Sequence, residues 1–246
     1  MISKKKAELT TQQIVMIIVL LTSFVILLVF LFKVNFQGTS EKEVCQSSIQ
    51  LTGKTSFFGK IDCKTNYVCI SGGGECKGFT SRETVNINLN DKSSKNKIMK
   101  ALADKMVDCW WMFGEGKINY VDWKAFSTRV CAVCSEIAFD EKLISNKEFN
   151  SISYADFYSF LKTNYTNEDK TQTYFDYLQL IELNKLNEIY IDTGIFFNQK
   201  YGIYTGRDEK WKAPLPFSGS NAVVPPLILD RTKSNLIGCK SFVTTP

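Results

Sequence analysis

The sequence predicts an α+β protein, in which one N-terminal transmembrane helix is followed by a disulfide-stabilised extracytoplasmic domain of short antiparallel strands and two to three helices. Three observations support this prediction. Residues 14–32 form an uninterrupted apolar run, all eight cysteines follow that run, and the later segments change from strand-like to helix-like and back to strand-like patterns. This order favours an α+β domain over a doubly wound sheet, and about 200 residues suffice for a domain with its own core.

The run over 14–32 has the length and composition of a membrane-spanning helix. Its 19 residues would extend about 28 Å as a helix, close to the hydrocarbon thickness of a bilayer. Lysines occupy positions 4–6 before the run, whereas the charges just after it balance, so the positive-inside rule places the N-terminus in the cytoplasm. The alternative is a cleaved signal peptide, but its apolar core is usually about 7 to 15 residues and ends at an Ala-x-Ala-like site. No such site follows Lys33. We therefore expect a single-pass protein of the cell membrane with its C-terminal domain outside.

Four parts follow from this topology: a cytoplasmic tail (1–13), a transmembrane signal anchor (14–32), a linker (33–44) and an extracytoplasmic domain (45–246). Without Lys4, Lys5, Lys6 and Glu8, the chain keeps a net charge of +3. No basic stripe marks a nucleic-acid site, and we expect no nucleic-acid partner. The expected partners are the lipid bilayer, through 14–32, and an envelope protein.

The cysteines predict a disulfide framework, because an even number lies entirely on the expected oxidising side of the membrane. The candidates are Cys45, Cys63, Cys69, Cys76, Cys109, Cys131, Cys134 and Cys239. Eight cysteines permit 105 fully paired arrangements, so the sequence leaves the connectivity open. One pair has a local argument: a hairpin turn through the glycines at 72–74 would place Cys69 opposite Cys76, within bridging distance.

The outer domain begins with strand-like patterns and then changes to a helical one. Short alternating segments over 45–89, including 57–61 and 84–89, predict strands. A helix is predicted over 95–112, which glycines at 114 and 116 end. Its apolar residues at helical spacing are Ile98, Leu102, Met106 and Cys109.

Residues 130–139 alternate and predict a strand, with Cys134 on one face. The opposite face would carry Cys131, Val133, Ser135, Ile137 and Phe139. Ser153 with Asp156 approximates a capping box and predicts a second helix, and 173–183 predict a third. Strands are predicted at 188–192, 201–205 and 223–229, the last outside the middle of a sheet because of Pro225 and Pro226.

Several kinds of chemistry are excluded by composition. The chain has no histidine, which removes Ser-His-Asp and Cys-His nucleophile systems and every zinc site that needs an imidazole. The segment 114–117 resembles a phosphate-binding loop only superficially, because Ile118 stands where a hydroxyl is required and the segment ends a helix. No spacing of carboxylates selects a catalytic pair. We expect no catalytic residue, no cofactor and no metal.

The motif Cys131-Ala-Val-Cys134 is the sharpest candidate for a reaction. A redox centre needs its first cysteine at a helix N-terminus, where the thiol pKa is lowered. The alternation around the motif predicts a strand instead, in which the two sulfurs point to opposite faces and serve different partners. A four-cysteine metal site that also draws on Cys63, Cys69 or Cys76 is a further alternative. We favour two structural disulfides.

Two surface features complete the candidate list. Trp110, Trp111 and Phe113 could form an exposed recognition patch, but such a cluster is more often core. Asn164 begins an Asn-Tyr-Thr glycosylation signature, which the expected outer location permits.

The segment 6–15 that leads into the apolar run, the block 101–116 and the segment 131–135 resemble a group of uncharacterised single-pass membrane proteins of small-genome archaea. This resemblance implies a signal anchor and a cysteine-bearing outer domain, and it implies no activity. Lys6-Ala7 before an apolar run also resembles an archaeal prepilin, but six residues separate Ala7 from the run.

Two functions remain open at this point. We favour a non-enzymatic envelope protein with a structural or protein-binding outer domain. The alternative is an extracytoplasmic thiol-disulfide oxidoreductase that uses Cys131 and Cys134.

Overall fold

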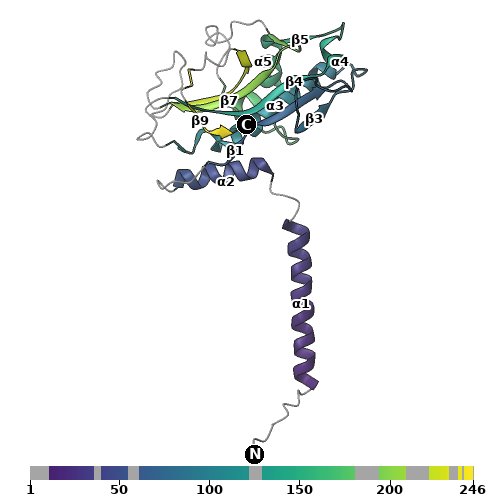
Figure 1. Ribbon diagram of the computed structural model, residues 1–246, viewed down its shortest axis with the longest axis vertical. Coiled ribbons are helices and arrows are strands. Elements are labelled where there is room, and N and C mark those ends of the chain that lie inside the picture. The colour runs from purple at the N-terminus through teal and green to yellow at the C-terminus, as the bar shows by residue number, and fades with distance from the viewer. Residues whose placement is uncertain are drawn as a thin grey trace, which may run out of the picture. The chain divides into compact units, whose positions relative to one another are not determined.

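The computed structural model describes residues 11–35, 40–54, 61–121, 129–180, 194–208, 222–232, 238–239 and 241–245 (Figure 1). Of residues 11, 27–35, 54, 208, 222 and 223 it describes the backbone alone. The chain forms two compact units, Met1–Ser40 and Glu41–Pro246, which we describe separately.

The first unit contains one helix, α1, over Thr11–Asn35. It includes the whole of the predicted 14–32 helix, and its two hydroxyl side chains bond back to the preceding turn: Thr22 Oγ1 donates to Ile18 O at 3.0 Å and Ser23 Oγ donates to Leu20 O at 2.9 Å. The large apolar side chains from Ile14 to Ile26 are 46 to 69% exposed. Within the residues described, no helix is both long enough and apolar enough to cross a membrane. The helix is therefore observed, and its assignment as a membrane anchor is not supported by this finding.

The second unit begins with a helix that the sequence analysis missed. Helix α2 covers Glu41–Lys54, so the strands expected from Cys45 onward are wrong for this segment. The last four residues of the predicted linker over 33–44 also belong to this helix, and the linker itself stays a prediction. Cys45 and Ile49 lie one helical turn apart and are both buried, whereas Val44 and Leu51 are exposed. This narrow apolar face explains why the helical period was weak in the sequence. Residues 57–60 of the predicted 57–61 strand lie outside the described residues.

The main sheet is mixed rather than antiparallel. Its strands are β2 (Asn66–Ser71), β3 (Glu83–Asn86), β4 (Val130–Phe139), β7 (Tyr201–Asp208) and β8 (Ala222–Asp230), in the order β3-β2-β4-β7-β8. Strands β3, β2 and β4 are parallel to one another, and β7 and β8 are antiparallel additions. The predicted class, α+β, is confirmed, but the prediction of antiparallel strands throughout was wrong.

Short strands complete this arrangement. Near the C-terminus, β9 (Ser241–Phe242) pairs with β4, and β10 (Thr244–Thr245) pairs with β1 (Cys63–Lys64). A separate pair consists of β5 (Ser151–Ser153) and β6 (Gly194–Phe196). The C-terminal segment thus lies beside the N-terminal half of β4.

Helix α3 covers Ser94–Met112, in agreement with the helix predicted over 95–112. It connects β3 to β4, as parallel strands require a crossover of this kind. Figure 1 shows α3 along the sheet, where it packs against β4, β7 and β8. The 3-10 turn η1 (Gly114–Gly116) follows it. Gly114 has φ +72°, and a Cβ at this position would lie 2.5 Å from Ile118 Cδ1, so both conformation and space require glycine where the helix ends.

Strand β4 coincides with the predicted strand, but its side chains do not alternate throughout. The pairing with β7 shifts between Val133 and Ser135, which makes Cys134 the extra residue of a bulge. Beyond the bulge, Ile137 and Phe139 share the main core with Cys134, instead of lying with Cys131 as predicted. The predicted face was therefore correct only up to the bulge.

Among the described residues, three helices lie between β4 and β7 in the sequence. They are α4 (Glu141–Ile144), α5 (Tyr154–Thr163) and α6 (Tyr174–Tyr177). Ser153 caps α5 as predicted, because its Oγ accepts from Asp156 N at 3.0 Å. Thr173 similarly caps α6, which ends at Tyr177, well before the predicted residue 183. The predicted strand over 188–192 lies outside the described residues.

The strands predicted at 201–205 and 223–229 are confirmed as parts of β7 and β8. Among the described strands, β8 lies at an edge of the sheet, the position that the two prolines were expected to require. The pairing between β7 and β8 shifts from Leu227 to Val224, and this irregularity accommodates Pro225 and Pro226.

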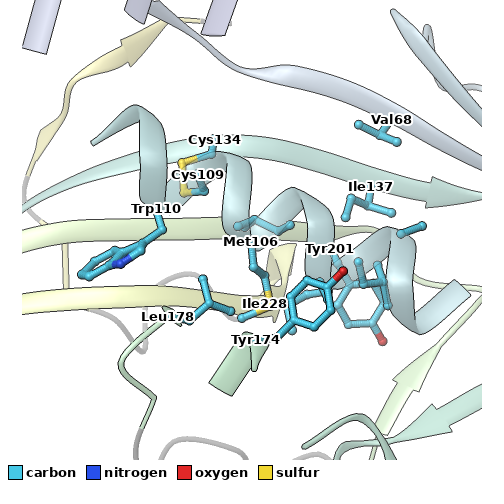
Figure 2. Close-up of a cluster of buried hydrophobic side chains, with 14 of the residues drawn as sticks. Val68, Met106, Cys109, Trp110, Cys134, Ile137, Tyr174, Leu178, Tyr201 and Ile228 are labelled. Carbon is cyan, nitrogen blue, oxygen red and sulfur yellow. A yellow bond between two sulfur atoms is a disulfide. The ribbon is translucent and has the colours of Figure 1, made fainter. Parts of the chain in front are cut away.

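The main core lies between the sheet and the helices (Figure 2). Trp110 and Phe113 are both 2% exposed, so the aromatic cluster at the end of α3 is core rather than a surface patch. Trp111 is half-buried and packs against the same core. A smaller cluster on the other side of β4 contains Cys131, Tyr204, Val224, Leu227 and Leu229.

Candidate functional site

All eight cysteines are paired. The four disulfides join Cys45 to Cys63, Cys69 to Cys76, Cys109 to Cys134, and Cys131 to Cys239. No free cysteine remains among the residues that the structure describes. Seven of the eight residues are buried, and Cys239 is half-buried. The predicted disulfide framework therefore uses every candidate cysteine.

The two cysteines of the Cys131-Ala-Val-Cys134 motif belong to different disulfides on opposite faces of β4, as the strand pattern predicted. Cys134 bridges to Cys109 and ties the sheet to α3 inside the main core (Figure 2). Cys131 bridges to Cys239 within the smaller cluster. Neither residue lies at a helix N-terminus, and both are almost completely inaccessible. The structure thus lacks the geometry of a reactive dithiol couple.

The Cys69–Cys76 pair is confirmed, but the hairpin that predicted it is absent. Strand β2 pairs with β3 and β4 in parallel, and the residues after Ser71 form a closed loop rather than a return strand. Each of the three glycines in this loop is required for a different reason. A Cβ at Gly72 would lie 2.7 Å from Leu89 Cδ1, Gly73 has φ +102°, and a Cβ at Gly74 would lie 2.9 Å from Asp140 Oδ2.

Asp140 is the most deeply buried acidic group among the described residues, and the sequence analysis missed it. Its Oδ2 accepts from Gly74 N at 2.7 Å and from Ser71 Oγ at 3.0 Å, while its Oδ1 accepts from Leu143 N at 2.9 Å and caps α4. Ser71 Oγ also accepts from Gly73 N at 2.9 Å. Because these contacts occupy the polar atoms of both buried side chains, the pair fixes the loop at the ends of β2 and β4 and offers no exposed nucleophile. The available signal was an aspartate directly after a strand and before a short helix.

A charged network joins α2, α3 and the edge strand β3. Lys105 Nζ lies 2.6 Å from Glu83 Oε1 and 3.4 Å from Asp108 Oδ2, and Lys42 Nζ lies 2.7 Å from the same Asp108 oxygen. Asn66 Nδ2 donates to Glu83 Oε2 at 2.7 Å. Lys105 is buried, but each charge in the network has an opposite partner. We interpret the network as a structural link between these three elements.

The network predicts part of the acid sensitivity of the fold. Burial raises the pKa of Glu83, but hydrogen bonds from Lys105 and Asn66 and the charges of Lys105 and Lys42 outweigh it, so this pKa lies below its ordinary value. A lowered folded-state pKa stabilises the protein above the unfolded-state value, and this stability is lost as the pH falls through the folded-state value. We expect Glu83→Gln to lose less unfolding free energy between pH 7 and pH 3 than the wild type, as measured by urea denaturation. Glu75→Gln, at an exposed position, should follow the wild type. Equal losses in all three proteins would contradict the prediction.

Asn164, the glycosylation candidate, ends helix α5. Its Nδ2 donates to Phe160 O at 3.0 Å and to Thr163 Oγ1 at 3.2 Å, and the residue is half-buried. In the folded protein the acceptor nitrogen therefore stabilises the helix end, and glycosylation stays a prediction.

No metal centre emerges from the geometry. Within the described ranges, no group of three or more His, Cys, Asp or Glu side chains could hold a metal ion. The four-cysteine metal site considered above is not formed, because Cys63, Cys69, Cys76, Cys131 and Cys134 are all in disulfides.

No protein-family model, curated protein or solved structure matches this chain. The fold and the cysteines define a disulfide-stabilised α+β domain, and any more specific function has to be argued from its own residues.

Proposed function

We propose that this chain is a membrane-anchored cell-envelope protein whose disulfide-stabilised outer domain has a structural or protein-binding role. The observation that carries the proposal is the use of all eight cysteines in four disulfides, seven of these residues being buried. Such frameworks form and persist in oxidising compartments outside the cytoplasm. The proposal includes the resemblance to uncharacterised single-pass proteins of small-genome archaea, which names no activity.

The sequence and the exposure of α1 support the membrane anchor. The 19 residues over 14–32 belong to α1, and the large apolar side chains described for this helix are 46 to 69% exposed. The hydrocarbon core of a bilayer would remove these side chains from water, which is favourable. The lysines at positions 4–6 favour a cytoplasmic N-terminus.

The geometry does not favour the alternative, a thiol-disulfide oxidoreductase. Such an enzyme cycles one accessible couple, whereas Cys131 and Cys134 lie in separate, buried disulfides. The framework instead serves to hold strands and helices together.

The thiol content of the native protein tests the function directly. We expect a maleimide reagent to label fewer than about one thiol in ten in the native, oxidised protein at neutral pH, because a thiol in a disulfide cannot react. The same protein, unfolded and reduced, should label at all eight cysteines. Mass spectrometry of the labelled protein gives both values. Rapid native labelling at Cys131 or Cys134 would contradict the structural role and support the oxidoreductase.

The topology has its own test. We expect a protease added to intact cells to remove an epitope tag placed after Pro246 and to leave a tag placed before Met1 intact, because the charge bias puts these ends on opposite sides of the membrane. Immunoblotting with and without lysis measures this. Protection of the C-terminal tag until lysis would reverse the proposed orientation.

A further inference from the structure

The four disulfides follow two different patterns along the chain. The two in the N-terminal half of the domain each join neighbouring cysteines of the sequence. The other two interlock, because Cys131 lies in the sequence between Cys109 and Cys134, which are bonded to each other. The partner of Cys131 is Cys239, which is 108 residues away. Joining neighbouring cysteines therefore completes the first two bonds but neither of the interlocked ones.

In the unfolded chain the nearest thiol to Cys131 is that of Cys134, three residues further on. The entropic cost of closing a loop rises with its length, so a bond between these two forms more readily than a bond from Cys131 to Cys239. Cys239 is also the last cysteine of the chain. Strand β9 begins two residues after it and pairs with β4 beside Cys131, so the native partner arrives only when the C-terminal segment docks.

The folded domain cannot keep a Cys131–Cys134 bond. Cys134 lies in the main core, whereas Cys131 lies in the smaller cluster on the other side of β4. A disulfide needs its two Cβ atoms about 4 Å apart, which the opposite faces of a strand do not allow. Helix α3 packs against the face of β4 that carries Cys134 and places Cys109 next to it (Figure 2). Formation of β4 thus replaces one neighbour of Cys134 with another.

We propose that Cys131-Ala-Val-Cys134 is an internal disulfide donor while the domain folds. An external disulfide, such as oxidised glutathione, first oxidises Cys131 and Cys134 and leaves as two thiols. The thiolate of Cys109 then attacks Sγ of Cys134: the Cys109–Cys134 bond forms, the Cys131–Cys134 bond breaks, and Cys131 leaves as a thiolate. This exchange consumes no oxidant. A second external disulfide then oxidises Cys131 and Cys239 and is itself reduced to two thiols.

This role belongs to the chain before it is folded, and it ends when both cysteines are buried in separate bonds. It is therefore compatible with a native protein that has no reactive couple. It also depends neither on the membrane anchor nor on a binding partner. Its failure would leave the pairing of all eight cysteines, and with it the proposed function, unchanged.

The test follows the order of bond formation in the full-length protein. The reduced protein is transferred from urea into detergent micelles with oxidised glutathione, samples are blocked with N-ethylmaleimide, and tryptic peptides are identified by mass spectrometry. Cleavage after Arg129 and Lys142 places Cys131 and Cys134 together in the peptide 130–142. A bond between them therefore appears as this peptide alone, lighter by two hydrogen atoms. We expect it to appear early and to decline as the Cys109–Cys134 bond forms.

Cys109→Ala should slow the loss of the Cys131–Cys134 bond about ninefold or more. Cys109 reaches Cys134 across 25 residues, whereas Cys239 must reach Cys131 across 108, and loop closure falls with about the 3/2 power of the length. Cys45→Ala is the matched control, because it also removes one cysteine of a native disulfide. This variant should lose the Cys131–Cys134 bond at the wild-type rate.

The proposal is overturned if the wild type forms Cys109–Cys131 or Cys109–Cys134 before any Cys131–Cys134 bond. It is equally overturned if Cys109→Ala loses the Cys131–Cys134 bond as fast as Cys45→Ala does. Both measurements count bonds rather than folded protein, so they decide the question even if Cys109→Ala does not fold.

Discussion

Replacing both Cys131 and Cys239 with alanine is expected to lower the free energy of unfolding by about 4 to 5 kcal/mol. The reason is the length of the loop that this disulfide closes, since its two cysteines are 108 residues apart. In the chain-entropy description, a loop on the order of 100 residues contributes about 4.7 kcal/mol by restricting the unfolded state. Urea denaturation of the oxidised proteins, followed by circular dichroism, measures the difference.

The matched control is the double alanine variant at Cys69 and Cys76, which are only 7 residues apart. The same description gives about 2.4 kcal/mol for this short loop. The double variant at Cys131 and Cys239 should therefore unfold at clearly lower urea than the control. Equal midpoints, or the reverse order, would show that loop length does not determine what these disulfides contribute.

Trp110→Ala is the second large effect, with an expected loss of about 3 to 5 kcal/mol of unfolding free energy. Trp110 is among the largest fully buried side chains and lies beside the Cys109–Cys134 disulfide in the main core (Figure 2). Truncation leaves a cavity that the disulfide prevents from collapsing, because the bond holds α3 and β4 together. Denaturation monitored by circular dichroism measures the loss.

Trp111 provides a control on the next residue of the same helix. It is half-buried, and Trp111→Ala should cost about 1 to 2 kcal/mol. If Trp111→Ala were as destabilising as Trp110→Ala, the assignment of Trp110 rather than Trp111 to the core interior would be wrong.

The sequence was sufficient for elements with a strong local period. The bounds of helix α3 and strand β4 were predicted almost to the residue. In α3 four apolar residues recur at helical spacing, and the sequence of β4 was interpreted as a two-residue alternation over its ten residues. Helix α2 was missed because only Cys45 and Ile49 mark its buried face. The bulge at Cys134 was missed as well, since it arises from the pairing with β7, more than 60 residues away.

The cysteine framework was predictable only where a local sequence period decides the direction of the side chains. Opposite faces of one strand follow from the period of two, so Cys131 and Cys134 could be assigned to different partners. The actual partners depend on tertiary packing: Cys131 is bonded to Cys239, and Cys134 is bonded to Cys109. Asp140 was missed because its role comes from neighbours that the fold brings together, Ser71 and Gly74.

The disulfides near the two ends of the domain also determine how it would respond to mechanical tension. The Cys45–Cys63 bond joins the first helix of the domain, α2, to β1, and Cys239 of the Cys131–Cys239 bond lies just before the last strands. A force pulling on the ends of the oxidised domain crosses these two covalent bonds and bypasses residues 46–62 and 132–238. Most of β4 and all of β7 and β8 belong to the bypassed part. The domain can therefore transmit a load between its two ends while most of its chain cannot be extended.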